Sequence, residues 1–134
     1  IMSFFSKVFN ENQSDSNGNE VDWIALQTLE QLDEIVQNSY EKPILIFKHS
    51  TRCSISRVAL SRFEREPLTN ESTDFLLLDL LQHRSLSQQL TERFGITHES
   101  PQVLIVKNGV CIYHANHLDI EPAEVDAALS ALGN

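Results

Sequence analysis

The sequence predicts an α/β domain in which a central mixed sheet is covered by helices on both faces. Three observations predict it. Strand-like and helix-like segments alternate along the chain, two of the strand-like segments are uninterrupted apolar runs, and a hairpin signal follows near the C-terminus. Alternation of this kind packs helices against one sheet, and an uninterrupted apolar run is typical of a strand covered on both faces.

The first strand and the first helix are predicted at the start of the folded region. Residues 23–26, Trp-Ile-Ala-Leu, have the composition of a short strand. Thr28 and Gln31 then stand at the spacing of a capping box, in which each residue satisfies a backbone N–H of the other. Apolar residues at helical spacing continue this helix to about residue 40.

The second strand, residues 44–48, is the first of the two apolar runs, and Pro43 opens it. The helix that follows begins at Cys53 and ends before Pro67. Its apolar residues recur at helical spacing. They predict a buried face made of Ile55, Val58, Ala59 and Phe63.

The second half of the chain repeats the alternation of strand and helix and then ends in a hairpin and a closing helix. Residues 75–80 are the second apolar run, and a helix follows with a capping box at 85–88 and an end at Gly95. Asn108-Gly109 between two strand-like runs predicts a hairpin, and a closing helix begins near residues 119–122. The predicted order is therefore β-α-β-α-β-α-β-β-α.

Length and charge limit the class of protein. The chain has 134 residues, which suits one domain. Its net charge of −9 disfavours binding to nucleic acid or to an anionic membrane. Residues 1–9 are apolar but too short to span a membrane, and residues 10–20 lack any large apolar side chain. We expect a flexible segment over 1–20 and one domain over 21–134.

The chain contains two cysteines, Cys53 and Cys111, which are too few for a disulfide framework and favour a reducing, cytoplasmic location. Cys53 stands where a buried strand changes into a helix, among the polar residues Thr51, Arg52 and Ser54. The free N–H groups of a first helical turn stabilise a thiolate. This position predicts a reactive thiol; the alternative is a buried, inert cysteine, which is the commoner kind.

The order of elements, with a cysteine after the second strand and Pro101 opening the strand before the hairpin, resembles the thioredoxin fold. The local sequences are more specific. They are similar to those of the monothiol bacilliredoxins of the YtxJ type, which act with bacillithiol. The resemblance covers residues 21–134 and is carried by three stretches: His49-Ser50-Thr51-Arg52-Cys53-Ser54-Ile55-Ser56, Ser100-Pro101-Gln102-Val103 and Tyr113-His114-Ala115-Asn116-His117.

The resemblance implies a redox-active thiol at Cys53 that faces a cis peptide bond before Pro101. Thioredoxins carry a second cysteine where this chain has Ser56. Because a hydroxyl cannot form a disulfide, we expect exchange with mixed disulfides: Cys53 removes a low-molecular-weight thiol, bacillithiol by resemblance, from client proteins. No further cofactor is expected. The residues expected to contact substrates are Thr51, Arg52, Ser54, Ser56, Ser100 and Pro101.

Two other functions would use the same fold. A redox-inactive binding module would keep the groove beside Pro101 but leave Cys53 unreactive. A thiol peroxidase would oxidise Cys53 to a sulfenic acid with peroxide. A phosphatase loop is excluded, because the position six residues after Cys53 holds Ala59 and not an arginine.

Histidines near the predicted site are candidates for tuning the thiol. His49 precedes Cys53 by four residues and either pairs with the thiolate or packs near the active loop. His117 returns toward the active end on the last strand and either lies near the thiol or is a surface histidine. Cys111 lies at the opposite end of that strand, so it is expected to be a packed residue and not a resolving thiol. Cys111, His114 and His117 do not converge on one face, and no metal site is expected.

Overall fold

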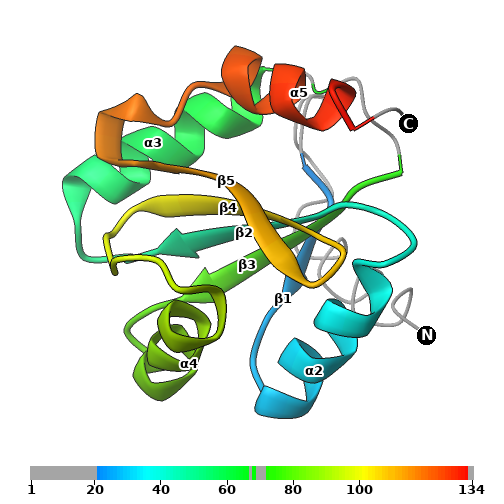
Figure 1. Cartoon of the computed structure of the whole chain (residues 1–134). Helices are drawn as coiled ribbons and strands as arrows, with labels where there is room; N and C mark the ends of the chain where they lie inside the picture. The colour runs from blue at the N-terminus through cyan, green and yellow to red at the C-terminus, as the bar shows by residue number, and fades with distance from the viewer. Residues whose placement is uncertain (1–20, 67, 69–71, 133–134) are drawn as a thin grey trace.

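The structure is a computed structural model that describes residues 21–66, 68 and 72–132, so the expected flexible segment 1–20 lies outside the described residues. The elements follow the predicted order (Figure 1). They are β1 (Trp23–Ala25), α2 (Leu29–Asn38), β2 (Ile44–His49), α3 (Ser54–Arg65), β3 (Asp74–Asp79), α4 (Arg84–Phe94), β4 (Gln102–Lys107), β5 (Val110–Asn116), the 3₁₀ turn η1 (His117–Asp119) and α5 (Pro122–Ser130).

The five strands form one mixed sheet in the order β1-β3-β2-β4-β5. β1 and β2 both pair with β3 in parallel, whereas β4 pairs antiparallel with both β2 and β5. The predicted mixed sheet is confirmed. The most buried strand is β2, in which all six residues are buried, and the helix that follows it begins directly after Cys53.

Helices cover the sheet from both sides: α3 and α5 on one face, α2 and α4 on the other (Figure 1). Side chains along β2 alternate between these two layers. Leu45 and Phe47 belong to the core under α3 and α5, and Ile44 and Ile46 to the core under α2 and α4. The same alternation directs Lys48 toward the α4 layer and His49 toward the α3 layer.

The aromatic core lies directly below α3. Trp23 packs edge-on against Phe47, with ring centroids 5.9 Å apart, and Phe47 packs similarly against Phe63 of α3 at 5.7 Å. All three side chains are fully buried. Such pairs add about 0.5–1.5 kcal/mol each beyond the burial of their area. They hold α3, and therefore its N-terminus, in a fixed position above the sheet.

The capping box of α2 is present as predicted. The Thr28 hydroxyl accepts from the Gln31 N–H at 3.1 Å, and the Gln31 side chain accepts from the Thr28 N–H at 3.2 Å. The helix ends at Asn38, two residues before the predicted limit.

Thr28→Ala is expected to lower the free energy of unfolding by about 1 kcal/mol, because it removes one half of this cap. Urea denaturation followed by the fluorescence of Trp23, the chain's single tryptophan, measures it. Thr28→Ser keeps the oxygen and should restore most of the loss. Equal losses in both variants would show that the cap does not carry the effect.

Two predictions about helices were wrong. Ile55 and Val58 are 45% and 50% exposed, so the buried face of α3 consists of Ser56, Ala59 and Phe63 instead. The second predicted capping box does not form: α4 starts at Arg84 with His83 as its N-cap, which places Ser85 inside the first turn.

The C-terminal hairpin and closing helix agree with the sequence. Asn108 and Gly109 both have positive φ angles, 54° and 79°, which a two-residue hairpin turn requires. α5 begins with Pro122, the residue type favoured at a first helical position. Among the described residues, the structure contains no helix with the length and apolar character needed to cross a membrane.

Candidate redox site at the start of helix α3

Cys53 is the N-cap of α3 and is half-buried. Its backbone is extended, its N–H donates to the Ser50 carbonyl at 3.2 Å, and its own carbonyl accepts the first helical bond from Arg57 at 3.0 Å. The Cys53 side chain makes no capping hydrogen bond, and no acidic residue stands in the first turn. Cys53 therefore stands at the end of α3 where backbone N–H groups are free and the helix dipole is positive.

The polar residues around Cys53 separate into two groups. Thr51, Arg52 and Ser54 are exposed on the surface beside the thiol, as their predicted role requires. The Arg57 guanidinium is also exposed and donates to the Thr51 carbonyl at 3.1 Å, which fixes the loop in front of the helix.

Ser56 belongs to the interior and not to the substrate surface. It is fully buried, and its hydroxyl lies 2.7 Å from His49 Nδ1 while accepting from the Ser50 N–H at 3.0 Å. These bonds tie the active loop to β2. Because Ser56 is buried, it is not placed to contact the substrate as predicted, although it occupies the position of the second cysteine of thioredoxins.

His49 pairs with Ser56, and no hydrogen bond joins it to Cys53. Burial lowers the pKa of His49 below its ordinary value; the charge of Arg57 acts in the same direction, and Asp79 opposes both. The imidazole is therefore neutral at pH 7. Its role is to hold the loop, the second of the two roles that the sequence left open.

The peptide bond between Ser100 and Pro101 is cis, as predicted, and Pro101 is buried. Ser100 and Cys53 line the same cavity, which has a volume of about 680 Å³. The chain segments 50–53 and 98–100, far apart in sequence, therefore meet at the site. The structure brings together Cys53 and the proline loop that the resemblance implied.

His117 has another partner. Its Nε2 lies 3.2 Å from a carboxylate oxygen of Glu99, and its N–H donates to the Pro101 carbonyl at 2.9 Å. Its side chain is about half exposed and does not line the cavity beside Cys53. The contacts of His117 thus lie with the proline loop; an influence on the thiol stays a prediction.

Cys111 is a packed residue of β5. Its thiol donates to the Tyr113 carbonyl at 3.3 Å, and burial raises its pKa above the ordinary value. The raised pKa makes the Cys111 thiol a poor nucleophile at neutral pH. Across residues 21–66, 68 and 72–132, no three His, Cys, Asp or Glu side chains gather in a way that could bind a metal ion.

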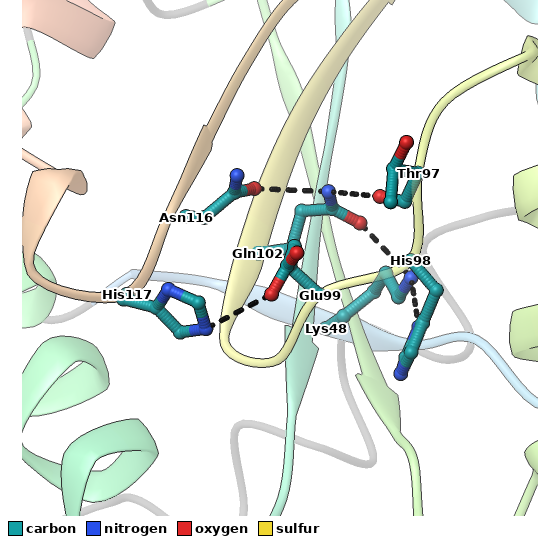
Figure 2. Close-up of polar contacts among 7 residues, drawn as sticks. All are labelled: Lys48, Thr97, His98, Glu99, Gln102, Asn116 and His117. Carbon is teal, nitrogen blue, oxygen red and sulfur yellow. Dashed lines mark hydrogen bonds and ion pairs between the residues drawn. The ribbon is translucent and has the colours of Figure 1, made fainter.

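A polar network around the buried Lys48, behind the proline loop, was not predicted from the sequence (Figure 2). Lys48 is fully buried, and its ammonium lies 2.9 Å from both His98 Nδ1 and Gln102 Oε1. The Gln102 amide donates onward to the Thr97 carbonyl at 3.0 Å and to Asn116 Oδ1 at 2.9 Å. The network fastens the loop before Pro101 to the sheet.

One signal in the sequence could have revealed it. Lys48 follows four apolar residues in a buried strand and shares its face with Ile44 and Ile46. A lysine at such a position needs polar partners. Its neighbours across the sheet are Gln102 on β4 and, beyond it, Asn116 on β5.

Solved structures with a similar fold indicate the class of protein. The chain is similar to a protein described as a candidate oxidoreductase with a thioredoxin fold, with 28% identity, coverage of 79% of this chain and 92% of that chain, and a TM-score of 0.69. Thioredoxin from Trypanosoma brucei brucei shares 13% identity (88% and 95% covered, TM-score 0.66), and thioredoxin f from spinach chloroplast 14% (89% and 100%, TM-score 0.65). The chain is a thioredoxin-fold oxidoreductase.

The family can be stated more narrowly. A family model described as monothiol bacilliredoxin BrxC matches residues 24–125. The chain belongs to this family, and its activity is that of a thiol–disulfide oxidoreductase.

Proposed function

We propose that this protein removes a low-molecular-weight thiol, bacillithiol, from mixed disulfides of client proteins through Cys53. The observation that carries the proposal is the half-buried thiol at the N-terminus of α3, in a cavity shared with Ser100 beside the cis proline. With a buried serine at the second-cysteine position, the motif holds a single sulfur.

The reaction is one thiol–disulfide exchange, and its atoms and electrons balance. The Cys53 thiolate attacks the small-thiol sulfur of the mixed disulfide, the client's S–S bond breaks, and the client leaves as a thiolate. A new S–S bond then joins Cys53 to the small thiol. A second molecule of a low-molecular-weight thiol releases Cys53 by the same exchange, which requires no metal and no bound cofactor.

Intact-mass measurement tests this proposal. We expect incubation of the reduced protein with oxidised bacillithiol to add the mass of one bacillithiol moiety, and peptide mapping to locate it on Cys53. Oxidised glutathione at the same concentration is the matched comparison and should give a slower adduct. An adduct on Cys111, or none with either disulfide, would contradict the proposal.

The same samples distinguish the two alternative functions. A redox-inactive binding module would form no adduct, and iodoacetamide would alkylate Cys53 no faster than free cysteine. A thiol peroxidase would consume hydrogen peroxide in repeated turnovers. Neither alternative is favoured by a contact of the described residues.

A further inference from the structure

Helix α3 exposes two large apolar side chains close to the reacting cysteine. Ile55 is 45% exposed and Val58 is 50% exposed, and they follow Cys53 by two and five residues. Residues three apart are neighbours on a helix surface. The packing of α3 onto the sheet does not use this pair, because other residues form the buried face of the helix. Neighbouring exposed apolar residues beside a reactive thiol are typical of a contact surface.

A hollow on the outer side of α3 includes one of these two residues. It has a volume of about 270 Å³ and is lined by Ser54, Arg57, Val58, Ser61 and Arg65, all of which are exposed. They recur at steps of three or four residues, so they form one stripe along the helix. We call these five residues the α3 stripe. It begins beside Cys53 and runs to the C-terminal end of α3.

The α3 stripe is basic although the protein is acidic. The chain has a net charge of −9, yet no Asp or Glu occurs between Glu41 and Glu64. Four of the ten basic residues are arginines of the segment 52–65. No acidic residue lines the hollow, so Arg57 and Arg65 give it a positive charge. A partner that complements this surface is therefore acidic.

Other charges of α3 are used within the protein. The Glu64 carboxylate accepts from the indole N–H of Trp23 at 2.7 Å, which turns it toward the aromatic core. Arg62 is paired with Glu121 at 2.9 Å. Arg57 donates one N–H to a backbone carbonyl of the preceding loop, and a guanidinium has five N–H donors. The exposed Arg57 side chain therefore retains donors for a carboxylate of another molecule.

The α3 stripe lies within reach of a polypeptide whose cysteine reacts with Cys53. A helix rises about 1.5 Å per residue, so along the axis Arg57 is about 6 Å and Arg65 about 18 Å from Cys53. An extended chain advances roughly 3.3 Å per residue. Residues about two and about five positions from the reacting cysteine of such a chain would therefore approach the two arginines.

We propose that the α3 stripe docks the client protein during mixed-disulfide exchange, and that it favours clients with acidic residues near the modified cysteine. Arg57 and Arg65 bind the client's carboxylates, and Ile55 and Val58 contact its apolar side chains. The inference rests on the proposed function, since the client leaves from the disulfide that Cys53 attacks. It adds the chemical class of the client.

Two peptides of equal length test the inference. Each carries one cysteine in a mixed disulfide with bacillithiol, and the positions two and five residues away on both sides hold Glu in one peptide and Lys in the other. Acid quench and mass spectrometry give the rate constant for release of each peptide thiol. The readout is the ratio of the rate constant of the glutamate peptide to that of the lysine peptide.

We expect this ratio to exceed one for the wild type at low salt. The net charge of −9 would by itself attract the lysine peptide, so a faster reaction of the glutamate peptide requires a local basic surface. The ratio should approach one in about 1 M salt, where the Debye length is about 3 Å. A wild-type ratio of one or less at low salt would overturn the inference while exchange at Cys53 stands. If neither peptide reacted, the proposed function and the inference would fall together.

Substitutions of single arginines locate the basic surface. Arg57→Gln and Arg65→Gln should each lower the ratio about threefold at low salt, as expected for one exposed ion pair. Because both peptides react with the same thiol, the ratio cancels any effect of Arg57 on the active loop. Arg93→Gln, the matched control on α4, removes the same charge at a residue already paired within the protein, and its ratio should equal that of the wild type.

Arg84→Gln tests the competing position for the acidic segment, because Arg84 is exposed and lines the cavity beside Cys53. A loss confined to this variant would place the acidic segment over α4 and overturn the inference. Equal losses in Arg57→Gln and Arg93→Gln would also overturn it, since they would show an effect of net charge alone.

Val58→Ser tests the apolar part of the stripe. Because Val58 is half exposed, the variant should leave the midpoint of thermal unfolding nearly unchanged. The rate constants of both peptides should fall about threefold, and the rate with oxidised bacillithiol should stay that of the wild type. An unchanged rate with the peptides, or an equal loss with oxidised bacillithiol, would overturn the contact between Val58 and clients.

A second copy of this acidic chain is the other occupant that the stripe could take. Sedimentation of the wild type and of the double variant Arg57→Gln/Arg65→Gln at the same concentration separates the two cases. We expect both proteins to sediment as monomers. A wild-type dimer that the double variant dissociates would assign the α3 stripe to self-association and overturn its role in docking clients.

Discussion

Cys53→Ser is expected to abolish thiol–disulfide exchange, the largest effect that one substitution in this chain should have. A serine hydroxyl is not ionised near neutral pH and cannot form a disulfide, so neither half of the exchange can proceed. The fold should be unaffected, because the Cys53 sulfur makes no capping bond and the replacement is slightly smaller. The rate of small-thiol release from a model mixed disulfide measures the effect.

Cys111→Ser is the matched control, since it makes the same exchange at the other cysteine. Its thiol is packed in β5 and donates to the Tyr113 carbonyl, so the variant should retain the full rate. If Cys53→Ser kept the activity and Cys111→Ser lost it, the reacting thiol would have to be assigned to β5. Loss in both variants would indicate a cycle that needs two cysteines.

The strands were predictable because each signal is local. The continuous apolar runs of β2 and β3 and the Asn108-Gly109 turn depend on residues next to one another in sequence. Cys53 was predictable for the same reason, since a strand-to-helix change marks it, whereas the cis bond before Pro101 was implied by the family resemblance. The mixed character of the sheet followed from the hairpin.

The error on α3 has a physical cause. Ile55 and Val58 stand at helical spacing, but an adjacent stripe contains Ser56, Ala59 and Phe63, and the two stripes share Ala59 and Phe63. Ser56, a small polar residue, occupies the buried position because its hydroxyl forms hydrogen bonds with His49 Nδ1 and with the Ser50 N–H. Periodicity of apolar residues cannot reveal a stripe that begins with a serine.

The cavity beside Cys53 could not be predicted from local sequence patterns. Its wall combines Ser50 and Cys53 with α4 and with the loop before β4. These segments meet only because β2 lies between β3 and β4 in the sheet. Ser87 and Thr91 look like ordinary helix-surface residues in the sequence, and only the packing of α4 makes their oxygens buried and unpartnered.

Lys48 gives the largest expected pH effect on stability. Burial lowers its pKa from the ordinary 10.5 to about 8, although the charge of Glu99 opposes this shift. Between those two pH values the unfolded chain binds a proton that the folded protein has released. Stability contributed by this group therefore rises with pH across that window, and the cost of burying the ammonium is fully present below pH 8.

Comparison of the wild type with Lys48→Met isolates this effect. The free energy of unfolding of the wild type minus that of the variant should rise by about 2 kcal/mol from pH 8 to pH 10, as urea denaturation at each pH would show. Subtraction cancels the titration of Cys111 and Tyr113, whose pKa values burial raises in both proteins.

The sign of this difference in the free energy of unfolding at pH 7 does not test the lowered pKa of Lys48. Methionine removes a buried charge, but it also leaves His98 Nδ1 and Gln102 Oε1 without their donor, and these two effects oppose each other. The change of the difference with pH reports the Lys48 proton once the general loss of one positive charge is corrected for. Lys107→Met, the same exchange at a partly exposed lysine on the adjacent strand β4, corrects for the general loss of one positive charge. A corrected difference in the free energy of unfolding that did not change from pH 8 to pH 10 would contradict this prediction. The Lys48 amine would then titrate as a solvated lysine does, and the network behind the proline loop would not contain a desolvated ammonium.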